Sequence, residues 1–388
     1  MKRSLRTAAF LCALVLAPAL LFSQADWSGQ PVKLSIIDVA GNLRLSKPAI
    51  EAFKAANPKM ISDIEYIIAT APELVAKIKA QQMAGNLDTT MVLTGYDGMA
   101  AGKEQGVWLQ VMPKYKDVFQ KSINSYLPGA RAAYNLFDGY GIAYVFCPGG
   151  PMFTYNPDTV KTPPRTAGQL LAWAKANPGK FLYARPANSG PGRAFLQGLP
   201  YILGDSNPKD PATWTKTWAY LKELDSYIDY YPSGTAITFK ELAEGTRWIL
   251  ASHLGWDMNM RILSTIPANF QAFFLDHTTW VNDTQFMVIP TGLDASREKA
   301  TVALMEWLMQ PAQQAVTYDD GYFYPGPSIR GVPLSMAPLS SQERIRPAMR
   351  AAYDQAAAKF PNASQLDAKP LVEAFDMWDK LVGAKIKN

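Results

Sequence analysis

Residues 32–39 read VKLSIIDV, residues 64–68 read IEYII and residues 90–93 read TMVL. Each segment is short, aliphatic and rich in β-branched residues, which is typical of strands buried in a sheet. Between them, Ser46-Lys47-Pro48 and Thr70-Ala71-Pro72-Glu73 have the composition of helix N-termini, and apolar residues at helical spacing follow both. This β-α-β-α-β order predicts a parallel sheet with right-handed crossovers.

The same pattern starts again in the middle of the chain. A short strand is expected at 152–155, and Thr166-Ala167-Gly168-Gln169 is a capping box that predicts a helix. Further strands are expected at 181–184 and 249–254, each followed by a loop rich in glycine and polar residues. A second α/β unit therefore follows the first.

The sequence predicts where these two units connect. Residues 139–155 and 280–290 are the two stretches in which the chain is expected to cross between them, without a low-complexity linker. We therefore predict an α/β fold of two lobes, each a mostly parallel sheet flanked by helices, joined by two crossing strands. The first lobe is expected to comprise 26–150 and 284–388, and the second 151–283. Short connections of this kind favour hinge motion.

The first 25 residues have the layout of a secretory signal peptide. Three basic residues precede an apolar run at 8–22, and Ser23 and Ala25 supply small side chains for a cleavage site. The run is short for a membrane span, so cleavage near Ala25 and export are expected. An uncleaved N-terminal anchor is the alternative.

Composition narrows the class of the exported protein. The formal charge of +5 includes three basic residues of the signal peptide, which leaves the remainder near +2 and gives no support for nucleic-acid binding. An apolar content of 48% suits a well-buried globular protein. Cys147 is the single cysteine after cleavage, so no internal disulfide is expected, and its apolar neighbours indicate a buried strand thiol.

The sequence motifs of common hydrolases are missing. The chain has two histidines, His253 and His277, without an HExxH motif, a GxSxG elbow or a His/Cys cluster with metal spacing. The stretch 190–195 lacks the third glycine of a dinucleotide fingerprint and the lysine of a P-loop. We therefore expect no catalytic residues, no metal ligands and no cofactor. A Ser-His-Asp triad assembled from distant segments remains the alternative.

Candidate ligand-binding residues come from the loops that follow the predicted strands. Ligands of open α/β sheets bind beyond the carboxyl ends of the strands. Glycines in these loops let backbone amides approach a ligand, Asp and Asn supply hydrogen bonds, and aromatic rings supply flat faces. Ordinary turn chemistry, or for Ser189 a simple helix cap, is the alternative. The predicted site residues are Gly41, Asn42, Tyr96, Asp97, Asn188, Ser189, Gly190, Trp256, Asp257 and Tyr324. Tyr324 is included because three aromatics in one turn, at 322–324, cannot all face one core.

Three further stretches resemble a known family. MFTYNPD at 152–158 resembles a hinge strand with its following turn, and 164–195 resembles the YnjB-like branch in particular. EWLMQPAQQA at 306–315 is similar to a helical segment that these proteins carry after the chain returns. The chain thus resembles a periplasmic solute-binding protein of a bacterial ABC transporter, over essentially all of the sequence after the signal peptide.

The resemblance implies a function without a catalytic step. It implies a periplasmic monomer that captures a small-molecule solute between its lobes and delivers it to an ABC permease and ATPase complex at the inner membrane. The identity of the solute stays open. A secreted α/β hydrolase with an unrecognised triad, and a secreted adhesin or lectin-like module, are the alternatives from other classes.

Overall fold

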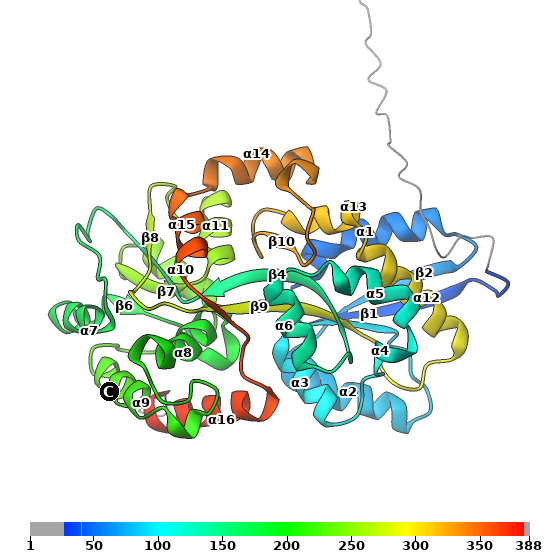
Figure 1. The fold of residues 1–388 in the computed structure, drawn as a ribbon, viewed down its shortest axis with the longest axis horizontal. Helices are drawn as coiled ribbons and strands as arrows, with labels where there is room; N and C mark the ends of the chain where they lie inside the picture. The colour runs from blue at the N-terminus through cyan, green and yellow to red at the C-terminus, as the bar shows by residue number, and fades with distance from the viewer. Residues whose placement is uncertain (1–26, 40, 384–388) are drawn as a thin grey trace, which may run out of the picture.

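The structure, a computed structural model, describes residues 27–39 and 41–383. The predicted signal peptide therefore lies outside the described residues. Two lobes lie side by side, and each consists of a sheet covered by helices (Figure 1). The first lobe is defined here by the sheet that contains β1, and the second by the sheet that contains β5. Within the described ranges, no helix combines the length and the apolar composition needed to cross a bilayer.

The first lobe is built on a mixed sheet of seven strands among the described residues, ordered β10-β4-β9-β3-β1-β2, with β11 beside β9. The strands are β1 (Val32–Asp38), β2 (Ile61–Ile68), β3 (Met91–Thr94), β4 (Ile142–Gly150), β9 (Trp280–Val288), β10 (Gly326–Pro327) and β11 (Asn362–Ala363). β1 pairs in parallel with β2 and β3, which confirms the β-α-β-α-β prediction. β9 then joins β3 in the antiparallel sense.

The second lobe has a smaller sheet, ordered β6-β7-β5-β8. Its strands are β5 (Met152–Tyr155), β6 (Phe181–Leu182), β7 (Ile249–Ser252) and β8 (Gln271–Phe273). β5 runs antiparallel to both β7 and β8, while β6 and β7 are parallel. The prediction of mostly parallel sheets is therefore wrong in this detail, because the strands next to the crossings run against their neighbours in both lobes.

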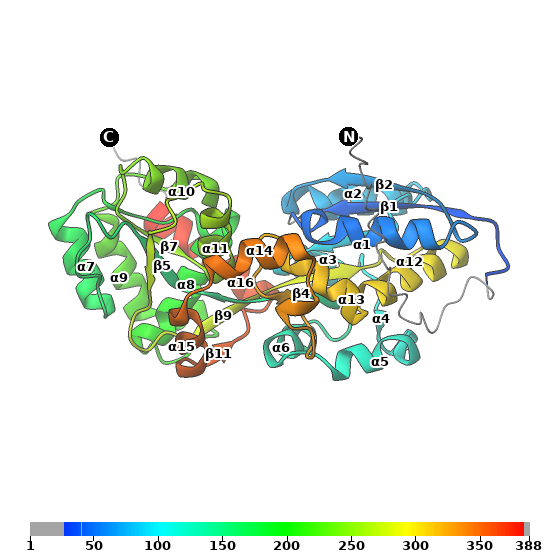
Figure 2. The same cartoon turned by 90° about the horizontal axis from the view of Figure 1, so that it is seen from above.

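Helices cover both faces of the two sheets (Figures 1 and 2). They are α1 (Leu43–Ala56), α2 (Ala71–Met83), α3 (Tyr96–Glu104), α4 (Val111–Lys114), α5 (Lys116–Asn124), α6 (Pro128–Leu136), α7 (Ala167–Ala176), α8 (Gly190–Leu203), α9 (Thr215–Asp225), α10 (Thr235–Ala243), α11 (Leu254–Ile262), α12 (Ala295–Leu308), α13 (Pro311–Gln314), α14 (Leu339–Ala348), α15 (Ala351–Lys359) and α16 (Ala368–Trp378). Seen from above, α14 lies over the junction of the lobes (Figure 2).

Several helices begin earlier than the sequence suggests. α1 begins at Leu43, three residues before the predicted start, because the Asp38 carboxylate accepts hydrogen bonds from the Asn42 and Leu43 amides, both at 2.9 Å. α3 begins at Tyr96 and α11 at Leu254, so segments expected as loops form the first turns of helices. The helix at 166–169 agrees with its prediction, since the Thr166 hydroxyl accepts the Gln169 amide.

The chain crosses between the lobes through adjacent strands. β4 and β9 run side by side through the middle of the molecule, where Gly150 pairs with Val281 (Figure 1). Ala363 of β11 pairs with the other edge of Val281, before the chain continues to α16. Gly149 has a positive φ of 83°, and a Cβ there would lie 2.0 Å from the Val281 carbonyl oxygen. Only glycine fits this close approach of two crossing strands.

Two large hydrophobic clusters underlie the lobes. The first contains Leu34, Val92 and Phe286, and the second contains Phe153 and Phe195. α16 contributes its apolar face to the second cluster, where the Trp378 ring N–H contacts the Tyr183 hydroxyl at 3.0 Å. The predicted boundaries put this helix with the first lobe, whereas its packing is with the second. Sequence order alone does not show that the C-terminal helices α15 and α16 return to the second lobe.

Candidate functional site

The N-termini of four helices come together at the junction of the lobes. Gly190, the first residue of α8, faces His253, which caps α11: a Cβ at 190 would lie 3.2 Å from His253 Nε2 and 3.5 Å from Asp283 Oδ2. Gly41, just before α1, faces the Tyr322 hydroxyl, and Gly95, just before α3, faces the Gln285 amide. The site thus combines both lobes with the crossing strand β9.

Arg193 on α8 lies at the centre of this site. Its side chain is almost fully buried, with Nη1 3.9 Å from Asp97 Oδ2 and Nη2 3.8 Å from Asp283 Oδ2. Within the part of the chain that the structure describes, its buried Nε has no hydrogen-bond partner. A buried guanidinium that makes only these long ion pairs is rare, since buried donors are nearly always satisfied.

Other buried polar atoms at the starts of α1 and α3 and on β9 also have no hydrogen-bond partner among residues 27–39 and 41–383. These atoms belong to the side chains of Asn42, Thr94, Asn282 and Gln285. Asn42 is fully buried, and neither its side-chain oxygen nor its side-chain nitrogen has a hydrogen-bond partner among the described residues. Leaving a buried polar group unsatisfied costs about 1–3 kcal/mol, so this concentration indicates a place for polar groups from outside the chain.

Burial controls the titration of the site. It lowers the pKa of His253 to about 3, assisted by the nearby Arg193 charge, so the imidazole is neutral at physiological pH. Burial also raises the pKa of Asp283, against the opposing effect of Arg193. A neutral His253 matches its structural role, because its Nδ1 accepts the Trp256 amide at 3.4 Å. In the described residues, no hydrogen bond joins either histidine side chain to a serine hydroxyl or a carboxylate.

Aromatic side chains form one wall of the site. The Trp256 ring on α11 stacks on Phe239 and meets the Tyr322 ring edge-on. The Arg44 guanidinium lies 5.1 Å from the centre of the Tyr322 ring, while its Nε is paired with Asp319 at 2.8 Å. Trp256 and Tyr322 are each half-buried, so neither residue is fully enclosed by the protein.

The structure brings together some of the predicted site residues. Gly41, Asn42, Asp97, Gly190 and Trp256 all lie at the junction described above. Tyr96 lies beneath it, fully buried, and its hydroxyl donates to the Asn282 side-chain oxygen at 2.8 Å. Ser189 caps α8 by accepting the Gly192 amide at 3.0 Å, which is the alternative that the sequence left open.

Three predicted residues lie elsewhere. Asn188 is exposed and lines a separate cavity of about 240 Å³ with Phe375 and Trp378. Asp257 is fully buried and paired with Arg261 at 3.0 Å, because the first turn of α11 directs its carboxylate into the protein. Tyr324 packs against Tyr318, 6.2 Å away between ring centres.

Sequence reasoning missed the most central residues. Arg193 is the only charged residue of the apolar helix GPGRAFLQGLPYIL, and this isolated charge was a usable signal. Asp283 had no such signal, because it looks like any polar residue within a strand. Tyr322, rather than Tyr324, faces the site from the aromatic turn.

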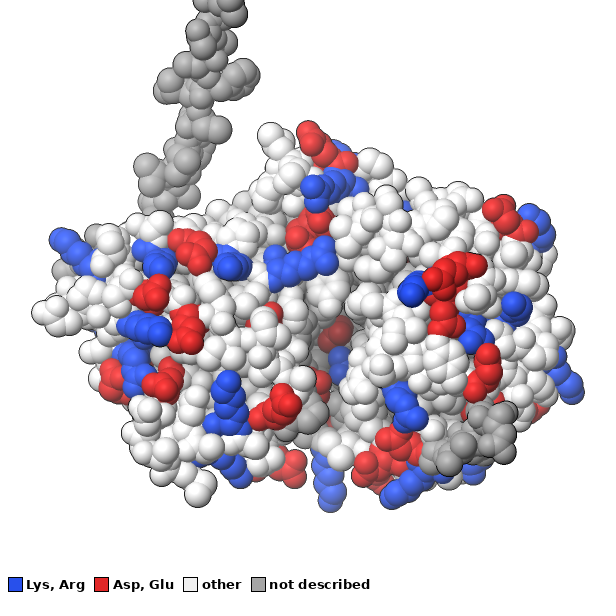
Figure 3. Space-filling view, turned by 180° about the vertical axis from the view of Figure 1, so that it is seen from behind, with Lys and Arg blue, Asp and Glu red and all other residues white. Residues whose placement is uncertain are grey.

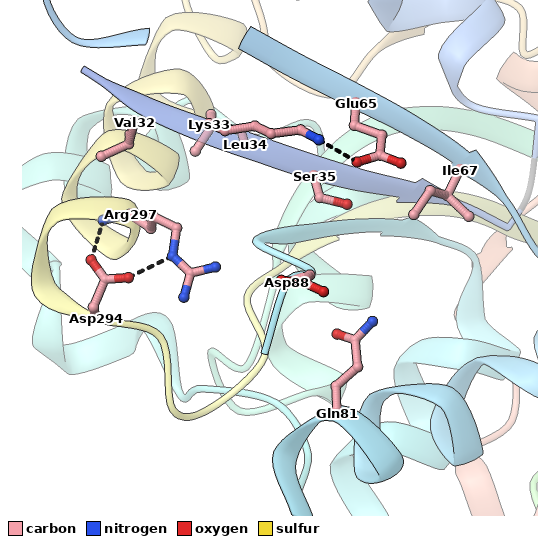
Figure 4. A pocket seen from close by; sticks show the side chains of 10 residues that line it. All are labelled: Val32, Lys33, Leu34, Ser35, Glu65, Ile67, Gln81, Asp88, Asp294 and Arg297. Atoms are coloured by element: carbon pink, nitrogen blue, oxygen red, sulfur yellow. Dashed lines mark hydrogen bonds and ion pairs between the residues drawn. The ribbon is translucent and has the colours of Figure 1, made fainter. Parts of the chain in front are cut away.

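The surface is hollowed where the lobes meet. Seen from behind, a depression between them contains both basic and acidic atoms at its floor (Figure 3). A different cavity of about 500 Å³ lies beside the start of β1, lined among others by Lys33, Asp88 and Arg297 (Figure 4). Lys33 is paired there with Glu65, and Arg297 with Asp294 (Figure 4). Among the residues that the structure describes, no group of three or more His, Cys, Asp or Glu side chains could hold a metal ion.

Comparison with known sequences identifies relatives. The sequence model of a family described as bacterial extracellular solute-binding protein matches residues 48–345. Protein YnjB of Escherichia coli (strain K12) is 26% identical over 223 residues, which are 53% of this chain and 55% of YnjB. The alignment therefore spans about half the length of that curated relative.

Comparison with solved structures confirms the predicted two-lobed α/β fold. The maltose/maltodextrin-binding domain MalE from Bdellovibrio bacteriovorus, bound to maltotriose, superposes with a TM-score of 0.67 at 14% identity, covering 92% of this chain and 95% of that chain. The spermidine/putrescine ABC transporter substrate-binding protein PotD from Streptococcus pneumoniae gives 0.61 at 15% identity, covering 91% and 98%. At such identities the likeness concerns the fold alone.

Proposed function

The chain belongs to the bacterial extracellular solute-binding protein family, and on this basis we propose that it is the exported binding component of an ABC importer. It captures a small solute between its two lobes and delivers it to a permease and ATPase complex at the inner membrane. The protein acts as a periplasmic monomer without a catalytic step, a cofactor or a metal.

One observation carries the proposal. Side chains from both lobes and from β9 converge on Arg193, whose Nε is buried and, among the described residues, unpartnered. A ligand in this position would contact both lobes at once. It would therefore bind the closed arrangement better than the open one, which is the condition for a ligand to shift a conformational equilibrium.

The proposed moving units follow the predicted division at 150/151 and 283/284, except near the C-terminal end of the chain. α16 moves with the second lobe, in whose hydrophobic cluster Trp378 lies, and α15 does so too, since its Tyr353 hydroxyl donates to Asp257 of α11. Opening would separate Asp97 from Arg193 and Tyr322 from Trp256, since each of these pairs joins one lobe to the other.

The experiment is a ligand screen followed by a measurement of shape. Purified protein is screened by thermal shift against a few hundred metabolites, since a ligand at 100 times its Kd adds about 2.7 kcal/mol of stability. Small-angle scattering is then recorded with and without the compound that binds most tightly. A smaller radius of gyration with ligand is expected, and equal radii at saturation would contradict the proposal. Labelling by a serine-reactive phosphonate would instead identify a hydrolase.

A further inference from the structure

The charges of the site restrict the chemistry of its ligand. We propose that the solute is a zwitterion, with its carboxylate on Arg193 and its ammonium group between Asp97 and Asp283. This inference rests on the proposed function and makes it more specific, since it assigns the solute class and the residue that receives each charged group.

Arg193 is the partner for an anionic oxygen. The residue is 8% exposed, and within the described ranges its buried Nε has no hydrogen-bond partner. A carboxylate accepts the fork of guanidinium donors in a planar geometry. The N-terminus of α8 is a weaker site for the carboxylate than Arg193. Pro191 has no N–H, and the Gly192 amide already donates to the Ser189 hydroxyl.

Asp97 and Asp283 are the partners for a cation. One oxygen of Asp97 accepts the Gly98 amide at 2.9 Å, and one oxygen of Asp283 accepts the Thr284 amide at 3.0 Å. The other oxygen of each carboxylate faces Arg193 at 3.9 and 3.8 Å, too far for a hydrogen bond. Both oxygens are therefore available to an ammonium group, which donates up to three hydrogen bonds.

The sum of charges excludes strongly charged solutes. Arg193 contributes one positive charge and Asp97 one negative charge, while Asp283 contributes at most one more negative charge because burial raises its pKa. The N-termini of α1, α3, α8 and α11 each add a partial positive charge of about +0.5, and the Asp38 carboxylate at the start of α1 offsets two of them. The total lies between zero and about +1, so a dianion or a polyamine would leave buried charge uncompensated. A solute with separate charges and no net charge fits.

Neutral hydrogen-bonding groups complete the site. The Asn42 amide and the Gln285 amide oxygen are buried and, among residues 27–39 and 41–383, without partners. Asn42 immediately precedes α1 of the first lobe, and Gln285 lies on β9. They can satisfy whatever polar atoms link the two charged ends of the solute.

The test compares matched compounds by thermal shift and then by calorimetry. The panel contains the proteinogenic amino acids, γ-aminobutyrate and betaine, together with the amide and the N-acetyl derivative of each primary amine. Maltotriose, spermidine and succinate represent neutral, cationic and dianionic solutes. At least one zwitterion is expected to bind, and loss of either charged group should weaken its binding by roughly 100-fold.

Variants test which residue binds each charged end of the solute. Arg193→Met should weaken the zwitterion by roughly 100-fold but change the affinity for its amide little, because the amide has already lost the carboxylate. Asp97→Asn should likewise weaken the zwitterion by roughly 100-fold. It should change the affinity for the N-acetyl derivative little, because that derivative has already lost the ammonium group. Arg165→Met and Asp158→Asn remove exposed charges of the second lobe and should leave affinity unchanged. If Arg193→Met does not fold, Arg193→Lys keeps the charge, loses the planar fork and should cost roughly 10-fold.

The outcomes separate this inference from the proposed function. If maltotriose, spermidine or succinate binds and closes the lobes while no zwitterion binds, the solute class is wrong and the transport function stands. No response to any zwitterion also overturns the inference. If Arg193→Met weakens the binding of the zwitterion and of its amide equally, the carboxylate of the solute does not bind to Arg193. A zwitterion that binds without a change in the radius of gyration would contradict the proposed function instead.

Discussion

The rings of Trp256 and Tyr322 meet edge-on across the junction of the lobes, with their centres 5.5 Å apart and their planes at 67°. Trp256 belongs to α11, whereas Tyr322 belongs to the turn that precedes β10 in the first lobe. Aromatic pairs in this geometry contribute about 0.5–1.5 kcal/mol beyond the area they bury. The contact therefore favours the closed arrangement even without a solute.

Replacing Trp256 by Ala should weaken solute binding by about 1–3 kcal/mol while the protein stays folded. The change removes both the aromatic wall and the contact that holds the lobes together. Calorimetry with the compound identified by the screen measures the loss. Trp173→Ala is the matched control, since Trp173 is a half-buried tryptophan on α7 in the second cluster. Normal affinity in a folded Trp256→Ala protein would show that Trp256 contributes to packing and not to solute binding.

Replacing Gly190 by Asp should abolish solute binding. The new carboxylate would point toward His253 and Asp283, which lie 3.2 and 3.5 Å from the position of the added Cβ. A second negative charge beside Asp283 is unfavourable and occupies the space of the ligand. Circular dichroism should stay normal, because the φ angle at 190 is one that any residue adopts. Gly168→Asp, in the first turn of α7, is the control: an added Cβ there would make only an ordinary contact, 3.9 Å from the Thr166 hydroxyl oxygen, and the variant should bind as the wild type does.

Replacing Gly149 by Ala should destabilise the crossing between the lobes. A left-handed φ costs a non-glycine residue about 1–2 kcal/mol, and the clash of the new Cβ with the Val281 carbonyl should add about 1–3 kcal/mol. Gly245→Ala isolates the first effect, since Gly245 also has a positive φ of 76° but no atom within 4 Å of an added Cβ. Thermal unfolding should therefore show a larger drop in Tm for Gly149→Ala. Equal drops would contradict the close approach.

Replacing Glu306 by Gln should stabilise the protein more as the pH rises. Burial on α12 raises the pKa of Glu306 from 4.5 to about 7. Between these values the folded state keeps a proton that the unfolded state has released, so the wild type loses stability as the pH rises through this range. The gain from Gln should be near zero below pH 4.5 and should level off above pH 7, at no more than about 3 kcal/mol.

Chemical denaturation at pH 4.5 and pH 8 measures the effect of Glu306→Gln. Glu104→Gln, at an exposed position of α3, is the control and should show no such dependence. A gain that is the same at both pH values would mean that the carboxyl group of Glu306 does not titrate between them.

The sequence predicted those parts of the fold that depend on local patterns. β1, β2 and β3 were found because their aliphatic runs are short and bounded by helix starts, and Thr166 was found because its capping box is local. The start of α1 was missed because Asp38 supplies its cap from the end of β1, before the helix. The return of α15 and α16 to the second lobe was missed because no local pattern distinguishes one lobe from the other.

The candidate site was predicted only in part, for a similar reason. Loops at strand ends indicated Asn42, Asp97 and Gly190, since the topology of an α/β sheet places such loops together. Asp257 was misplaced because one helical turn decides which way a side chain points. Asp283 and Tyr322 could not be found, because their roles depend on contacts between segments far apart in the chain.

β4, β9 and β11 form one continuous ribbon at the junction of the lobes, because Val281 of β9 pairs with Gly150 on one edge and Ala363 on the other. Because the hydrogen bonds between these strands oppose sliding of one strand along its neighbour, we expect the lobes to move relative to each other mainly by bending at this ribbon. A pair of fluorescent labels, one on each lobe, would then report that bending as a change in a single distance.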